Sequence, residues 1–150
     1  MEKQNFYDLN FDQLKIFLIE KVNVENNKAN MRAQQMFNAV YKNNIKNFDE
    51  LTTLSLDLRE KIKKLISLAK PKIIDIQKSK DGTIKFLLEL KDKRNVETVL
   101  IPDKSQSRYT ICLSVSVGCY LSCEFCATAQ ISKNLVRNLS AGEIISQIIL

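Results

Sequence analysis

Three cysteines stand close together in the last third of the 150-residue chain, at positions 119, 123 and 126. The pattern Cys119-x-x-x-Cys123-x-x-Cys126 therefore offers three thiolates from one short segment. Thiolates of this kind hold iron–sulfur clusters, and three of them can hold three irons of a [4Fe-4S] cubane. The fourth iron then stays open to a small molecule, which a cluster with four cysteine ligands does not allow. The spacing predicts a cluster that takes part in chemistry.

An open iron can bind the amino and carboxylate groups of S-adenosyl-L-methionine. An electron passed through the cluster can then break a C–S bond of that molecule and release a 5′-deoxyadenosyl radical. Phe125 stands directly before the third cysteine. In this respect the segment resembles the radical-SAM enzymes, which commonly carry an aromatic residue at this place near the bound cofactor. The resemblance implies that Phe125 binds the cofactor.

Two other readings of the cysteines stay open, a zinc site and ordinary core cysteines. Structural zinc needs four ligands, usually in paired Cys and His sets. The chain has no histidine, and its fourth cysteine, Cys112, falls within a predicted strand, where it is poorly placed as a fourth ligand. In a cytosolic protein thiols stay reduced, so metal or redox roles are favoured over disulfides.

The residues before the cysteines predict an α+β domain of helices followed by strands. Asn10 and Gln13 form a capping-box pattern before the first helix, and a third helix is expected to begin near Ser55 and to be stopped by Pro71. Strands follow, with a hairpin turn at Asp81-Gly82 that requires positive φ at both central residues. We predict a domain over residues 1–102, a linker over 103–108, and a second segment over 109–150.

That second segment reads as a strand over 109–116, a cysteine loop, and a helix with a capping-box pattern at Ser140 and Glu143. One βα unit cannot bury its own faces, so we interpret it as the first unit of an incomplete radical-SAM barrel. In βα barrels the loop after a strand is where active sites lie. Alone, this second segment is expected to aggregate and to expose four isoleucines of its helix, namely Ile144, Ile145, Ile148 and Ile149.

Charge is distributed unevenly along the chain. The net charge is +6, and residues 1–110 carry 21 of the 23 Lys and Arg against 15 of the 17 Asp and Glu. This pattern is typical of a phosphate-facing region, although plain Lys-rich composition explains it equally well. The chain shows no signal peptide and no apolar stretch of membrane-spanning length, so we expect a cytoplasmic protein with no membrane contact.

Four blocks, in order, carry a resemblance to a known family. They are RAQQMFNAVYKNNIKNFDELTTLS (32–55), DGTIKFLLELKDKRNVETVLIP (81–102), TICLSVSVGCYLSCEFCATAQ (110–130) and RNLSAGEIISQ (137–147). Together they resemble the N-terminal portion of RlmN/Cfr-type radical-SAM methyltransferases. That family methylates carbon 2 of adenine in 23S rRNA and tRNA. Carbon 2 is electron-poor, so ordinary displacement on S-adenosylmethionine cannot reach it.

The resemblance implies roles for two further residues. Glu97, in VETVLIP, matches a glutamate proposed as proton acceptor, and Cys112, in TICLSVS, matches the cysteine that resolves a protein–RNA adduct by forming a disulfide. From the residues alone, an exposed strand carboxylate and a small buried strand residue are the simpler readings. The resemblance also implies rRNA and tRNA as partners, and a reductant protein such as flavodoxin or ferredoxin.

Most of the barrel and the methyl-carrying cysteine are absent from these 150 residues. We therefore expect the chain to be inactive alone, with the missing C-terminal barrel portion as a further partner. Two alternatives remain. One is a non-catalytic RNA-binding remnant of such an enzyme, and the other is a small zinc-binding protein.

Overall fold

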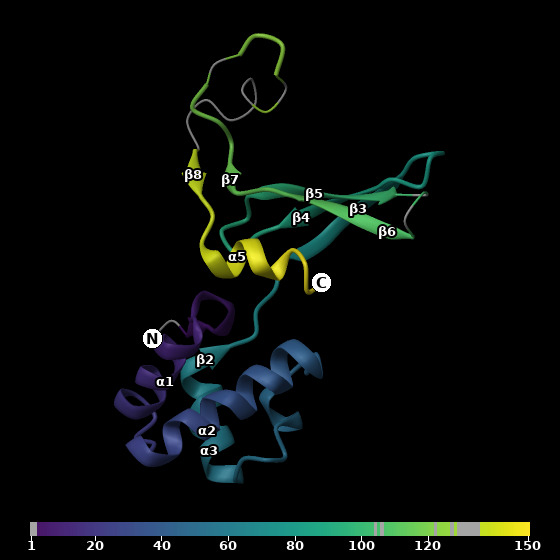
Figure 1. Ribbon diagram of the computed structural model, residues 1–150. Coiled ribbons are helices and arrows are strands. Elements are labelled where there is room, and N and C mark those ends of the chain that lie inside the picture. Colours follow the sequence, from purple (N-terminus) through teal and green to yellow (C-terminus); the bar gives the residue numbers. More distant parts are fainter. Residues whose placement is uncertain (1–2, 104, 106, 122, 127, 129–135) are drawn as a thin grey trace. The chain divides into compact units, whose positions relative to one another are not determined.

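A computed structural model describes residues 3–103, 105, 107–121, 123–126, 128 and 136–150. The chain divides into two compact units, Met1–Ala69 and Lys70–Leu150 (Figure 1). The first is mainly helical and the second is built on strands.

The helical unit encloses an aromatic core. Its elements are β1 (Gln4–Asn5), the 3-10 turn η1 (Phe6–Asp8), α1 (Phe11–Glu20), α2 (Asn26–Phe37), the π-helical turn η2 (Asn38–Lys42), the 3-10 turn η3 (Phe48–Glu50), α3 (Leu56–Leu65) and β2 (Ile66–Ser67). Phe6 is fully buried, and its ring centroid lies 5.5 Å from that of Phe37 and 6.5 Å from that of Phe48. This packing joins the start of the chain to α2 and η3.

The predicted caps of this unit are confirmed, but α3 ends earlier than expected. The Asn10 side chain accepts from Gln13 N at 2.8 Å, and Ser55 caps α3. The helix stops at Leu65 rather than near Pro71. Ile66 adopts extended φ and ψ and pairs with Gln4 in a short parallel ladder, while its side chain is 1% exposed. Pairing of Ile66 with β1 therefore replaces a further turn of α3.

The second unit is built on a four-stranded antiparallel sheet in the order β3-β4-β5-β6. The strands are β3 (Lys72–Lys78), β4 (Ile84–Glu89), β5 (Asn95–Asp103) and β6 (Arg108–Leu113). In the turn between β3 and β4 only Gly82 has positive φ, at +95°, so the expected positive φ at Asp81 is wrong. The loop has three residues instead of two, since Ser79 N donates to Thr83 O at 2.9 Å. A three-residue loop needs the left-handed conformation only at its last position.

The sheet continues across the expected linker. Asp103 pairs with Arg108, so residues 103–108 span the turn of a β5–β6 hairpin. The strand expected over 109–116 is extended over Arg108–Leu113, but it belongs to this sheet. The boundary between compact units thus falls at Ala69, whereas the sequence suggested a division after Pro102. Hydrogen bonding along the whole hairpin is the physical reason for the difference.

Beyond the sheet lie β7 (Ser116–Val117), β8 (Arg137–Asn138) and α5 (Ala141–Ser146). The core of this unit is a buried cluster that α5 covers, and Figure 1 shows α5 against the sheet; its members are Leu88, Leu90, Val96, Val117 and Leu139. Ile144 packs on that cluster, most of whose members lie before residue 109, outside the segment that was expected to expose Ile144 when alone. Ile145 and Ile148 do stay exposed, at 36% and 51%, and Ile149 is intermediate. Within the described residues, no helix has the length and apolarity to cross a membrane.

Candidate functional site

The segment with the three cysteines begins directly after β7. Gly118 has a φ of +69°, a conformation that favours glycine, and it turns the chain from Val117 into Cys119. Ser116 Oγ donates to the Gly118 carbonyl at 3.1 Å and supports that turn. In Figure 1 this segment continues from β7 as the green trace. The short strand β7 and Gly118 therefore set the direction of the chain at Cys119.

The three thiols lie in a partly open setting. Cys119, Cys123 and Cys126 are each intermediate in exposure. Cys126 N donates to Cys123 O at 3.1 Å, which makes a tight turn between the second and third cysteines. Leu121 N lies 3.4 Å from Cys119 Sγ, so a backbone donor already faces one sulfur. Hydrogen bonds to sulfur are among the features that tune iron–sulfur centres.

The three cysteine thiols are the right type of ligand for an iron–sulfur cluster, but, in the part of the chain that the structure describes, they are not arranged around a common centre. Three thiols from one segment match a cubane with one open iron, and a chain without histidine offers zinc no paired Cys and His set. Among the described residues, however, no three Cys, Asp or Glu side chains are arranged to hold a metal ion. Residues 122, 127 and 129–135, which flank the cysteines, lie outside the described residues. The fit therefore concerns ligand type and spacing, with Cys119, Cys123 and Cys126 as the residues that would hold the group.

Phe125 is the most exposed large apolar residue of the segment, at 92%. Tyr120 and Leu121 are also exposed, at 79% and 68%. Singly exposed apolar side chains are ordinary, but three within six residues make an unusual apolar surface. Only Phe125 was expected to contact a cofactor, although the segment YLSCEF also contains Tyr120 and Leu121.

Glu97 and Cys112 share one face of the sheet. Cys112 on β6 stands opposite Val99 on β5, and Glu97 precedes Val99 by two residues. Because side chains two apart on a strand point the same way, Glu97, Val99 and Cys112 all belong to one face. Both Glu97 and Cys112 are exposed, so the expectation of a buried Cys112 on packing grounds is wrong.

Glu97 has a charged partner that the sequence pattern did not indicate. Lys85 on β4 also stands opposite Val99, and its Nζ lies 3.0 Å from Glu97 Oε1. A cross-strand ion pair between half-exposed groups is weak in water, so its main effect is to hold the carboxylate over this face. The alternation of side chains along β4 and β5 indicates the face on which each of these residues lies. Only the pairing register shows that Lys85 and Glu97 are neighbours.

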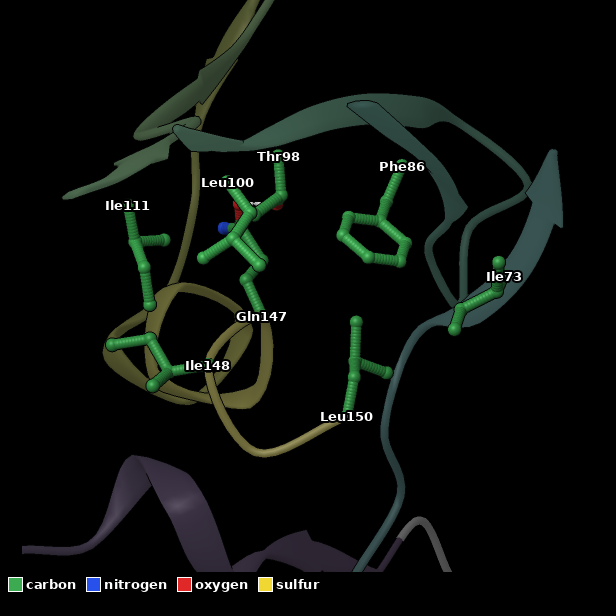
Figure 2. Close-up of a pocket in the computed structure, with 8 residues that line it drawn as sticks. All are labelled: Ile73, Phe86, Thr98, Leu100, Ile111, Gln147, Ile148 and Leu150. Atoms are coloured by element: carbon green, nitrogen blue, oxygen red, sulfur yellow. Dashed lines mark hydrogen bonds between the residues drawn. The ribbon is translucent and has the colours of Figure 1, made fainter. Parts of the chain in front are cut away.

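The opposite face of the sheet carries an apolar pocket of about 250 Å³. It is lined by Ile73, Phe86, Thr98, Leu100, Ile111, Gln147, Ile148 and Leu150. Figure 2 shows Gln147 and Thr98 turned toward each other at its inner end, where Thr98 Oγ1 donates to Gln147 Oε1 at 2.8 Å. The pocket's polar groups thus already satisfy one another, and none of the predicted site residues lines it.

Comparison with known proteins connects these features. Residues 4–68 match the family model of the ribosomal RNA large subunit methyltransferase N-terminal domain. A dual-specificity RNA methyltransferase RlmN from Campylobacter fetus is 40% identical over 97% of the chain and 41% of its own length. A probable dual-specificity RNA methyltransferase RlmN from Staphylococcus saprophyticus is 38% identical over 99% of the chain and 38% of its own length.

A crystal structure of a radical SAM methyltransferase from Sphaerobacter thermophilus has the same fold. It superposes with a TM-score of 0.80 at 32% identity, over 97% of this chain and 40% of that one. The fold and the cysteine pattern together define the class of radical-SAM methyltransferases. Within that class, the chain belongs to the RlmN-type RNA methyltransferase family, as part of its N-terminal portion. It spans about 40% of the length of the curated relatives it matches.

Proposed function

We propose that this chain acts in methylating carbon 2 of adenine in 23S rRNA and tRNA. The observation that supports the proposal is relatedness over 97–99% of the chain to proteins named dual-specificity RNA methyltransferases. The three cysteines stand in the same chain, in the spacing that such chemistry needs. A compartment with reduced thiols, the cytoplasm, suits that chemistry.

On this proposal the chain's residues divide into two groups. Cys119, Cys123 and Cys126 hold the cluster, and Phe125 lies beside S-adenosyl-L-methionine. When bound, the cluster supplies the electron that starts radical chemistry on that cofactor. We take a reductant protein such as flavodoxin or ferredoxin as its source.

The second group lies on the open face of the sheet. Glu97 is the proton acceptor toward adenine, and the ion pair with Lys85 keeps its carboxylate over that face. The Cys112 thiolate attacks the sulfur of a cysteine outside these 150 residues, and a disulfide forms as the bond from that sulfur to the methylene carbon on adenine breaks. The released carbon keeps the electron pair and takes up a proton, which completes the methyl group. The exposure of Cys112 supports this role, because a resolving thiol must be reached by another sulfur. Because that second cysteine belongs to another part of the enzyme, we propose that the 150 residues alone do not methylate RNA.

The test is the content of 2-methyladenosine in RNA from the source cell. Deleting the gene that encodes this chain should remove 2-methyladenosine from 23S rRNA and tRNA, as measured by mass spectrometry of nucleosides. Restoring the gene should restore the modification, whereas a copy with Cys123→Ala should not. A matched copy with Cys112→Ala should accumulate a covalent protein–RNA adduct, because resolution fails after the carbon–carbon bond has formed. Unchanged 2-methyladenosine in the deletion strain would sink the proposal.

A second candidate function is RNA binding without chemistry. The observation that favours it is the net charge of +6, all of which lies in residues 1–110. Binding of this kind is electrostatic and falls steeply as salt rises. Retention of 2-methyladenosine in the Cys123→Ala strain would favour this alternative.

A further inference from the structure

Arg137 joins three segments of the second unit. Its Nη1 and Nη2 donate to Glu143 Oε2 and Oε1 at 2.8 and 2.7 Å, and its Nε donates to Asp92 Oδ2 at 2.8 Å. Asp92 lies in the turn between β4 and β5, and Glu143 caps α5. Paired hydrogen bonds between a guanidinium and a carboxylate are directional as well as strong. Arg137 therefore fixes β8 against both the sheet and α5.

This anchor stands where the cysteine segment returns to the fold. Arg137 pairs with Val117, and Val117 is two residues before Cys119. The β7–β8 ladder is only two residues long on each strand, and the strands are separated in sequence by residues 118–136. Bringing together two strands so far apart in the sequence costs conformational entropy that so short a ladder offsets poorly. The ladder therefore depends on further contacts, among them the apolar cluster that holds Val117 and Leu139, the hydrogen bond from Leu139 N to Val115 O, and the Arg137 ion pairs.

The charges around Arg137 predict that a neutral residue in its place would leave two neighbouring carboxylates without their shared cation. Hydrogen bonds from Arg137 lower the pKa of Glu143, whereas the nearby negative charge of Asp92 raises it. The two carboxylates thus repel each other and are held together by the guanidinium between them. Its side chain is 31% exposed, so solvent screens these interactions only in part.

We propose that Arg137 is a positioning residue for the cysteine segment, holding the base of the loop so that Cys119, Cys123 and Cys126 can close around a cluster. This inference rests on the proposed function, since it needs the cysteines to bind iron and sulfide. Arg137 does not bind the cluster itself. It acts on the cysteine segment through β8 and its partner Val117. Groups that hydrogen-bond directly to metal ligands commonly change metal affinity by ~10–100-fold when replaced, and we expect a more remote anchor such as Arg137 to fall at the low end of that range.

The test is cluster retention by the full chain after anaerobic reconstitution with iron and sulfide. We expect Arg137→Gln to release iron to a chelator about tenfold faster than the unaltered chain. We also expect a changed electron paramagnetic resonance signal from the reduced cluster. Arg137→Lys keeps the positive charge but cannot bind both carboxylates at once. Its rate of iron release should therefore lie between those of the unaltered chain and Arg137→Gln. Asp92→Asn leaves the Glu143 pair and the α5 cap in place, and should show a smaller change of the same kind.

Arg108→Gln is the matched control. It removes an ion pair with Asp103, at 3.2 Å, from the same sheet but at the β5–β6 turn, and it should retain iron like the unaltered chain. The role of Arg137 would be overturned if Arg137→Gln and Asp92→Asn retained iron as well as the Arg108→Gln control and gave the same resonance signal. An unaltered chain that takes up zinc but no iron and sulfide would overturn the proposed function, and this inference with it.

Discussion

At the scale of single residues, Gln147 is a buried polar side chain that links three parts of the second unit. It is 4% exposed, and its Oε1 accepts from Thr98 Oγ1 at 2.8 Å and from Ser114 N at 3.1 Å. Its Nε2 donates to Ser114 O at 2.9 Å and to Glu143 O at 3.2 Å. Each polar atom of the side chain is thus satisfied across α5, β5 and the residue after β6. A buried side chain used in this way specifies one packing of the helix on the sheet.

Replacing Gln147 by leucine should therefore destabilise the protein although it adds apolar surface. The substitution leaves the buried Thr98 hydroxyl and the Ser114 peptide groups without partners, at a cost of about 1–3 kcal/mol. Urea unfolding should show a lower midpoint with an unchanged slope. Gln77→Leu on exposed β3 is the control, and we expect a change within about 0.5 kcal/mol. Equal midpoints for the two variants would contradict this reading.

Local residue patterns were predictable to different degrees. The Asn10–Gln13 and Ser140–Glu143 boxes both form as the sequence indicates, because each needs only neighbours three residues apart. Gln147 gave no such signal, since its partners Thr98 and Ser114 are 49 and 33 residues away. For Lys85 and Glu97, alternation indicates the face on which each side chain lies, but the register that brings the two together cannot be read from either strand alone.

At the scale of elements, α5 is too short to be stable alone and relies on its N-terminal cap. The helix has six residues, Ser140 Oγ accepts from Glu143 N at 3.1 Å, and Glu143 Oε2 accepts from Ser140 N at 2.9 Å. Helices of this length are marginal in water without tertiary contacts. The Glu143 carboxylate also binds Arg137, so a single ionised group supports the start of the helix and the base of the cysteine loop.

Because the Glu143 carboxylate both caps α5 and binds Arg137, the stability of α5 should depend on pH. Hydrogen bonds from Arg137 lower the pKa of Glu143 below its ordinary 4.5, although burial opposes the shift. Because the folded pKa is the lower one, ionised Glu143 stabilises the fold above about pH 4.5, and this contribution is lost as the pH falls through the folded value. The midpoint difference between the unaltered chain and Glu143→Gln in urea should therefore be largest near neutral pH and shrink below about pH 4.5. A difference that stays constant through that range would exclude the mechanism.

The elements around the cysteines could be predicted only in part. The turn at Gly118 and the helix near Ser140 follow from residue types, and both are present. The ladder of β7 with β8 has two residues on each strand, too few for any alternating pattern, and it forms because Val117 and Leu139 reach the same core. The roles assigned to Glu97, Cys112, Phe125 and the three cluster cysteines stay predictions.

At the scale of the whole molecule, the sequence located the strands, and the compact units divide at Ala69 while the sequence pattern suggested a division after Pro102. Residues 103–108, DKSQSR, have the composition of a linker, and the same composition suits a hairpin turn. Only pairing between β5 and β6 distinguishes the two, and pairing is a property of the folded chain. The mixed architecture of helices followed by strands was nevertheless predicted, because the apolar period changes near Lys72.

The division at Ala69 also changes where the positive charge lies. Residues 70–150 carry 12 Lys and Arg against 8 Asp and Glu, a net +4, whereas residues 1–69 carry 11 against 9, a net +2. Several lysines of the helical unit are already neutralised, since Lys61 pairs with Asp57 at 2.9 Å and Lys63 with Asp49 at 2.8 Å. Within the part of the chain that the structure describes, Lys78 and Lys80 beside the β3–β4 turn have no carboxylate partner and are exposed.

If RNA binds through charge, the strand unit should therefore contribute more than the helical unit. We expect Lys78→Gln with Lys80→Gln to weaken binding of the full chain to a tRNA transcript. The slope of log affinity against log salt should become shallower by up to about two, roughly one for each phosphate that a lysine no longer neutralises. Lys61→Gln with Lys63→Gln removes the same charge but frees carboxylates that those lysines neutralised. Fluorescence anisotropy over a potassium chloride series measures both pairs. The two effects would be equal if net charge alone governed binding, and the larger effect would lie with Lys61 and Lys63 if the helices form the RNA surface.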